Sequence, residues 1–196
     1  MNKTSCKTLP ILCVALVVAF LVTVSGVAAA QDVFRVNYFS NANTTGAPDG
    51  TVWSTNPGVG YVTLCAMVYV FDWDQQMTEC CGCPQTHNDL RWFSVNKDLT
   101  GNPLTGKKSV DGVVKIVSAA VNNAPCDPTA NVTPTPNLRQ WSTHIQNKVG
   151  ASYPITETES SDSTLGATEL ANLQAQCAFI GILGSGNGIC TCGIGD

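Results

Sequence analysis

Three cysteines lie within four consecutive positions, at Cys80, Cys81 and Cys83, and this cluster limits the possible folds more than any other feature. Adjacent side chains of an extended chain point to opposite sides, so Cys80 and Cys81 should reach different parts of the fold. We therefore expect disulfide bonds from this one stretch to join separate parts of the fold. The possible partners after position 31 are Cys65, Cys126, Cys177, Cys190 and Cys192.

The first thirty residues have the pattern of a secretory signal peptide. Two lysines precede an almost unbroken apolar run over residues 9–24, and three alanines at 28–30 match the small residues that a signal peptidase recognises. We expect cleavage before Gln31, which removes two of the ten cysteines and leaves eight. The alternative, an uncleaved membrane anchor, is disfavoured because the run is short for a hydrocarbon layer of about 30 Å.

An even number of cysteines in an exported chain predicts disulfide bonds, here four. We expect one bridge to tie the cluster to the C-terminal Cys190-x-Cys192 segment. A second, from Cys83 or Cys65, should hold the loop of Cys126 or the helix of Cys177. The eight predicted disulfide cysteines are Cys65, Cys80, Cys81, Cys83, Cys126, Cys177, Cys190 and Cys192.

A structural zinc site is the rival interpretation of the cysteines. Cys80, Cys83, Cys190 and Cys192 would supply four thiolates, but only the first pair has the usual C-x-x-C spacing. Exported thiols also tend to be oxidised, so disulfides are favoured. A thioredoxin-like redox role is weaker still, because the cluster lacks the strand-to-helix setting of such a site.

The net charge of the chain limits the classes of partner that it can bind. The predicted mature chain, residues 31–196, keeps eight of the ten basic residues against fourteen acidic ones, a net charge near −6. This excess of acid argues against nucleic acid and against anionic lipid, both of which attract basic surfaces. A chain of this length suits one domain with a real core. After the signal segment, no apolar stretch is long enough to span a membrane.

Alternation and β-branched content predict strands over residues 33–39, 51–55, 61–71, 90–95 and 113–117. The segment 61–71 is apolar on both faces, so it should be a central strand with both faces covered, as in a sandwich whose strand meets a helix or a second sheet. The predicted fold is mainly β, an antiparallel sandwich or half-open sheet with two C-terminal helices, in a disulfide-rich α+β arrangement.

The two helices are expected from caps and apolar spacing. Thr135 followed by Pro136 resembles a helix start, and Leu138, Trp141 and Ile145 recur at intervals of three and four, which predicts a helix to about residue 147. A second helix is expected over residues 167–180, with Cys177 on its inner face.

Asp72, Asp74 and Glu79 are the main candidates for chemistry. They could bind calcium, although most of the calcium-loop signature is missing, or act as a catalytic pair with His87 in a secreted hydrolase. The interpretation that we favour is a turn with its acids in water. His87 is expected in a loop and His144 half-buried on the first helix. No motif for a nucleotide or organic cofactor is present.

Trp53, Trp73 and Trp92 lie in or beside the predicted β region. Aromatic side chains on a sheet face or loop can stack on sugars or anchor a partner. The interpretation that we favour is that they fill the core of a small domain.

The chain also contains several longer motifs that are similar to those of a known group of proteins. They are LCAMVYVFD, ECCGC, SVNKDLTGNPLTG, VVKIVSAA, TPTPNLRQW and GSGNGICTCG. On these motifs the chain resembles a group of small exported proteins of soil acidobacteria. The resemblance implies export and one type of domain, and it assigns no activity, ligand or site residue.

The sequence as a whole predicts an exported, non-catalytic structural or binding protein of the cell surface or extracellular space, with a protein or carbohydrate partner. The alternatives are the hydrolase and a calcium- or zinc-binding module.

Overall fold

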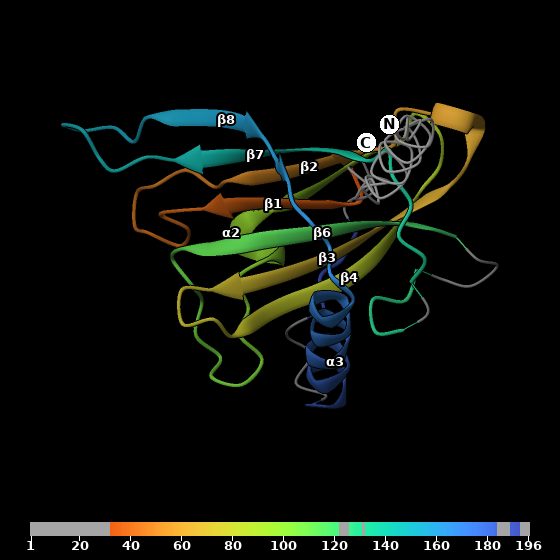
Figure 1. Cartoon of the computed structure of the whole chain (residues 1–196). Helices are drawn as coiled ribbons and strands as arrows, with labels where there is room; N and C mark the ends of the chain where they lie inside the picture. Colours follow the sequence, from red (N-terminus) through yellow and green to blue (C-terminus); the bar gives the residue numbers. More distant parts are fainter. Residues whose placement is uncertain (1–31, 122–125, 131, 184–188, 193–196) are drawn as a thin grey trace, which may run out of the picture.

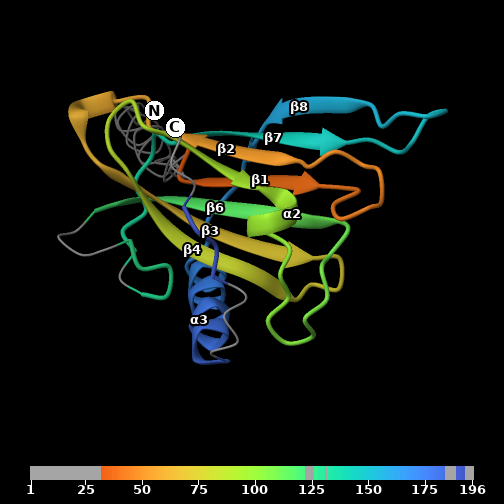
Figure 2. The ribbon, with the colours of Figure 1, turned by 180° about the vertical axis from the view of Figure 1, so that it is seen from behind.

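The computed structural model describes residues 32–121, 126–130, 132–183 and 189–192. The predicted signal peptide and cleavage site lie outside these residues. Within them, two antiparallel sheets face each other and one long helix packs on the far side of the larger sheet (Figures 1 and 2). The mainly β, disulfide-rich sandwich predicted from the sequence is confirmed, with one C-terminal helix in place of two.

The larger sheet, sheet A, has the strand order β4-β3-β6-β1-β9, and the smaller one, sheet B, has the order β5-β2-β7-β8. The strands are β1 Phe34–Phe39, β2 Thr51–Thr55, β3 Leu64–Asp72, β4 Met77–Gln85, β5 Leu90–Ser94, β6 Gly112–Ala120, β7 Arg139–Ile145, β8 Ile155–Glu159 and β9 Ser161–Asp162. The helices are η1 Val59–Tyr61, α2 Val95–Asp98 and α3 Ala167–Leu183.

Strand β3 is the centre of the molecule, as its two apolar faces predict. One face packs against sheet B, where the core contains Leu64, Ala66, Val68 and Val70 together with Val52, Phe93, Leu99 and Leu138. The other face packs against α3, and this second core contains Cys65, Met67 and Tyr69 together with Leu173, Cys177 and Ile180. Burial on both sides explains why the segment carries almost no polar residue.

Four disulfides join distant parts of the chain to β3 and β4. Cys65 bonds to Cys126, Cys80 to Cys177, Cys81 to Cys190, and Cys83 to Cys192. As expected for neighbours in an extended chain, Cys80 faces α3 whereas Cys81 faces the core between the sheets. The expected link from the cluster to the C-terminal segment is present twice. Cys65, and not Cys83, holds the Cys126 segment.

The C-terminal segment of residues 189–192 covers the outer edge of β4. Ile189 pairs in parallel with Cys80, and the Cys190 amide donates to the Cys80 carbonyl oxygen at 3.3 Å. An unpaired strand edge is open to pairing with other chains. The two tail disulfides therefore protect an edge that would otherwise expose its backbone groups along this stretch.

On the opposite side, the chain crosses from sheet B to sheet A between β8 and β9. Arg35 of β1 is buried there, and its guanidinium contacts Asp32 at 2.9 Å, Asp162 at 3.2 Å and the Ser160 carbonyl oxygen at 3.2 Å. A buried cation requires such partners. This ion-pair network holds the crossing segment against β1 and joins the two sheets.

The helix predicted from Pro136 to about residue 147 is wrong, since this segment forms β7. Gln140, Ser142 and His144 are buried while Trp141 and Thr143 are partly exposed, so burial alternates with the period of a strand. The apolar spacing at three and four was coincidental, because the buried face of β7 is largely polar. The missed strand β4 has a related cause, since its buried residues are mostly cysteines and polar residues rather than aliphatic ones.

None of the described helices is long and apolar enough to cross a membrane.

Candidate ligand-binding face on sheet B

Three tryptophans form one row across the outer face of sheet B. Strand pairing places Trp53 of β2 opposite Trp92 of β5 on one side and opposite Trp141 of β7 on the other. The next position along the row is Glu159 of β8, opposite Trp141. Because neighbouring strands lie about 4.8 Å apart, the three positions span roughly 10 Å. The Trp53 and Trp92 ring centroids are 6.5 Å apart, with the ring planes at 47°.

Strand alternation turns this row away from the core. Val52 and Ser54 flank Trp53 in the sequence and are buried between the sheets, so the indole of Trp53 lies on the outer side. Trp92 is 38% exposed, and Trp53 and Trp141 are half-buried. The favoured interpretation of Trp53, Trp73 and Trp92 as core residues is therefore wrong. Trp73 lies in the turn between β3 and β4 and is 72% exposed.

Polar residues flank the tryptophan row on both sides. Thr51 of β2 is two residues before Trp53 and therefore lies on the same outer face, and Thr143 of β7 lies opposite Glu157 of β8. On the other side of the row, Thr55 lies between Leu90 and Arg139. The outer face thus combines a central line of aromatic rings with hydroxyl and charged groups at its margins.

The tryptophan row contains a shallow, open depression. Its volume is about 360 Å³, and it is lined by Trp53, Leu90, Trp141 and Glu157. Glu157 is the single charged side chain of the lining, and it is exposed. Such a surface can receive a flat, partly apolar group by stacking, and it offers one carboxylate to accept hydrogen bonds.

The three candidate acids do not form a site. Asp72 accepts hydrogen bonds from the Gln76 amide at 2.9 Å and from the Asn102 side chain at 3.2 Å, so it stabilises the β3–β4 turn. Asp74 is exposed in that turn, as expected. Glu79 is buried on β4 and accepts a hydrogen bond from the Gly101 amide at 3.0 Å, so its interpretation as a solvated acid is wrong.

The histidine of the hydrolase hypothesis lies far from the aspartates of the turn. His87 follows the end of β4, where its ring contacts Tyr61 edge-on at 5.6 Å. Asp72 lies at the opposite end of the β3–β4 pair, because Leu64 at the start of β3 pairs with Gln85 at the end of β4. Eight residues of strand correspond to roughly 26 Å. These residues do not form a catalytic constellation.

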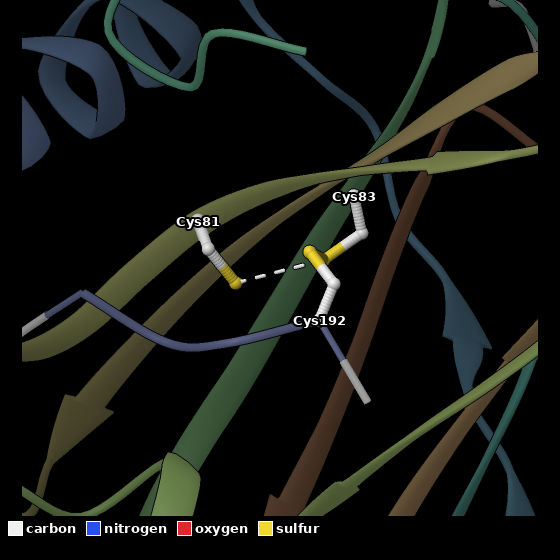
Figure 3. Close-up of side chains that lie close together, drawn as sticks. All are labelled: Cys81, Cys83 and Cys192. Carbon is white, nitrogen blue, oxygen red and sulfur yellow. Dashed lines mark hydrogen bonds between the residues drawn. A yellow bond between two sulfur atoms is a disulfide. The ribbon is translucent and has the colours of Figure 1, made fainter. Parts of the chain in front are cut away.

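The cysteines offer the single cluster of metal-ligand type among the described residues, at Cys81, Cys83 and Cys192. Figure 3 shows Cys81 and Cys83 projecting from the same side of β4, with their sulfur atoms 3.8 Å apart. Both are disulfide-bonded to the tail. The zinc set predicted with Cys80 is not assembled, because Cys80 is bonded to Cys177 on the other face. No described acidic group joins this cluster, so a calcium site is not formed by it either.

His144 is fully buried on β7, and not half-buried on a helix as predicted. Its Nε2 lies 2.6 Å from the Thr158 hydroxyl, and its ring stacks on Tyr38 with centroids 4.1 Å apart. Burial lowers the pKa of His144 below its ordinary value of 6.5, and a hydrogen bond with the Tyr38 backbone offsets part of this effect.

The buried His144 makes stability depend on pH. Above about pH 6.5 the imidazole is neutral in both folded and unfolded states, and its contribution is fully present. As the pH falls below this value the unfolded chain gains a proton that the folded protein resists, so stability is lost by up to about 1.4 kcal/mol per pH unit. Urea unfolding at several pH values should show a shallower loss in His144→Gln. An unchanged slope would contradict the assignment.

No protein-family model and no curated protein matches the chain. Among solved structures, the chain is similar to Thermotoga maritima 1070, with a TM-score of 0.40 and 12% sequence identity, over 70% of this chain and 97% of that one. A likeness at this level assigns no function to the chain.

Sequence reasoning missed Trp141 as a surface residue because its segment was assigned to a helix. A strand assignment would have placed Trp53, Trp92 and Trp141 on three strands, although only the pairing register shows that they form one row.

Proposed function

We propose that this chain is an exported, non-catalytic binding domain that holds a carbohydrate chain on the outer face of sheet B. The observation that carries the proposal is the row Trp92, Trp53 and Trp141. Tryptophans that point outward in register on three adjacent strands do not fill the core between the sheets, and they form a surface on which ring-shaped ligands can stack.

A carbohydrate suits this face better than a protein partner. A pyranose ring presents C–H groups to an aromatic face and hydroxyl groups at its rim, which matches indoles flanked by Thr51, Thr143 and Glu157. A stable protein complex needs roughly 800 Å² on each partner. The described depression is small and open, which favours one extended, narrow chain over a broad protein surface.

Export is supported by the covalent structure and by the sequence. Four disulfides within one small domain are typical of oxidising compartments outside the cytoplasm. The signal-peptide pattern before Gln31 and the resemblance to small exported proteins of soil acidobacteria point the same way. We place the protein outside the cell or on the bacterial surface.

The residues that line the depression favour binding over catalysis. No serine, cysteine or histidine lies among the residues that line the depression, and its one acid has no second carboxyl in the lining. Glycoside hydrolysis generally needs two carboxyl groups at a set separation. The proposal is therefore a domain that retains a carbohydrate without cleaving it.

The test is a binding assay against a panel of soluble oligosaccharides and insoluble polysaccharides. Trp53→Ala combined with Trp141→Ala should weaken binding by at least about tenfold, since central aromatic residues carry most of the energy of such contacts. Trp73→Ala is the matched control, because it removes an exposed tryptophan from the β3–β4 turn. A loss in the control as large as in the double variant, or no binding to any saccharide, would refute the proposal.

A further inference from the structure

We infer, building on the proposed function, that the carbohydrate carries protonated amino groups, as in a chain of glucosamine-type sugars. The ammonium group is held between the indole faces of Trp53 and Trp141 and the carboxylate of Glu157. The proposal commits to an amino-sugar polymer as the occupant of the depression.

The first support is the position of Glu157. Glu159 lies directly opposite Trp141, and Glu157 is two residues before it on the same outer face of β8. Diagonal neighbours of this kind in an antiparallel sheet are roughly 7–8 Å apart, within reach of long side chains. Glu157 and both tryptophans also line the same depression, so a sugar seated there lies beside all three.

The second support is the balance of charge around the row. Among the described residues, Glu157 makes no ion pair, whereas Glu159 lies 3.6 Å from the buried Arg35. None of the described residues that line the depression is basic, and Arg139 at the start of β7 contacts Asp32 at 3.2 Å. The depression therefore carries an uncompensated negative charge that attracts a cation and repels polymers of acidic sugars.

The third support is the chemistry of the lining. The face of an indole ring carries partial negative charge and attracts ammonium groups, and tryptophan is the strongest such partner among the side chains. A carboxylate beside it accepts a charge-assisted hydrogen bond from the same group. An amino sugar supplies both a ring for stacking and an ammonium group, which explains the presence of aromatic rings and an acid in one lining.

The experiment uses three oligosaccharides of equal length, built from glucosamine, N-acetylglucosamine and glucose. Isothermal titration calorimetry is carried out at low ionic strength and at a pH where the free amines are protonated. We expect the glucosamine oligomer to bind about tenfold more tightly than the other two, because hydrogen bonds to charged groups are worth about this factor. Acetylation removes the charge and keeps the ring, so it isolates the ammonium contact.

Variants separate this inference from the proposed function. Glu157→Gln should abolish the preference for the glucosamine oligomer over the glucose and N-acetylglucosamine oligomers, whereas the double tryptophan variant should weaken binding to all three. Asp74→Asn, which makes the same charge change in the exposed β3–β4 turn, should leave the preference intact. Equal binding of all three oligomers, with loss in the double tryptophan variant, would overturn the amino-sugar inference while the carbohydrate function stands.

Two further outcomes decide the remaining cases. If none of the three oligomers and no other saccharide binds, both proposals fail. If a lysine oligomer binds as tightly as the glucosamine oligomer and depends equally on Glu157, the site recognises cations in general and the commitment to amino sugars is overturned.

Discussion

Replacing both Cys80 and Cys177 by serine is expected to lower the free energy of unfolding by about 4 kcal/mol, of which about 3 kcal/mol comes from loop closure. The Cys81–Cys190 bridge already joins β4 to the chain just after α3, so the Cys80–Cys177 bridge closes a ring of roughly 15 residues. It is also the one described disulfide that holds α3 against sheet A. Its loss also loosens Leu173 and Ile180, which complete the second core. Guanidinium unfolding of the oxidised proteins measures the effect directly.

The matched control is the double replacement of Cys83 and Cys192. The neighbouring bridge between Cys81 and Cys190 joins the same strand to the same tail, and the two sequence separations are both 109. Once one bridge has closed this long loop, the second closes only a ring of a few residues, so its removal should cost roughly half as much or less. An equal decrease in the free energy of unfolding of the two double variants would contradict this explanation of how the disulfides stabilise the fold.

Gly82→Ala is expected to destabilise the fold by roughly 3 kcal/mol, at the upper end of the usual cost of overpacking. The β-carbon of an alanine at this position would overlap the carbonyl group of Cys126. That carbonyl cannot easily withdraw, because Cys126 is bonded to Cys65 of β3 and the Tyr69 hydroxyl donates to the nearby Pro128 carbonyl oxygen at 2.8 Å. Thermal and chemical unfolding report the change.

Gly181→Ala is the matched control for Gly82→Ala, and it is not expected to destabilise the fold. Gly181 lies in α3 with open space around the position of an added β-carbon. Alanine is a better helix former than glycine, so this variant should be neutral or more stable by up to about 1 kcal/mol. If both glycine variants were equally destabilised, crowding against Cys126 would not be the cause at Gly82.

The parts of the fold that could be predicted are those encoded in short stretches of chain. The two apolar faces of β3 indicated a strand covered on both sides, and the caps and apolar spacing of residues 167–180 indicated α3. The opposite directions of Cys80 and Cys81 followed from extended backbone alone. Each of these features depends on neighbours within a few residues, so each can be recognised without the tertiary structure.

The wrong predictions arose where local pattern and tertiary environment disagree. Strand β7 buries Gln140, Ser142 and His144 between the sheets, so hydrophobic periodicity gave no strand signal. Glu79 has an ionisable side chain and is nevertheless buried, where its carboxylate accepts a hydrogen bond from the backbone amide of Gly101. Tertiary partners at distant positions decide both cases, and a single sequence does not display them.

The candidate binding face is the clearest example of a feature that depends on segments far apart in the chain. Trp53, Trp92 and Trp141 are separated by 39 and 49 residues in the chain, and only the antiparallel register of β5, β2 and β7 places them in one row. A shift of one residue in either pairing would turn a tryptophan into the core. The position of Glu157 beside the row depends equally on the pairing of β7 with β8.

The sequence by itself determined that this is a β-rich chain with an even set of cysteines, a central apolar strand and a final helix, because composition and short-range periodicity specify these properties. The tertiary structure alone decided which cysteines pair and which tryptophans face outward. Both depend on contacts between segments far apart in the chain, and one of many possible disulfide connectivities and strand registers is selected only when the two cores pack around β3.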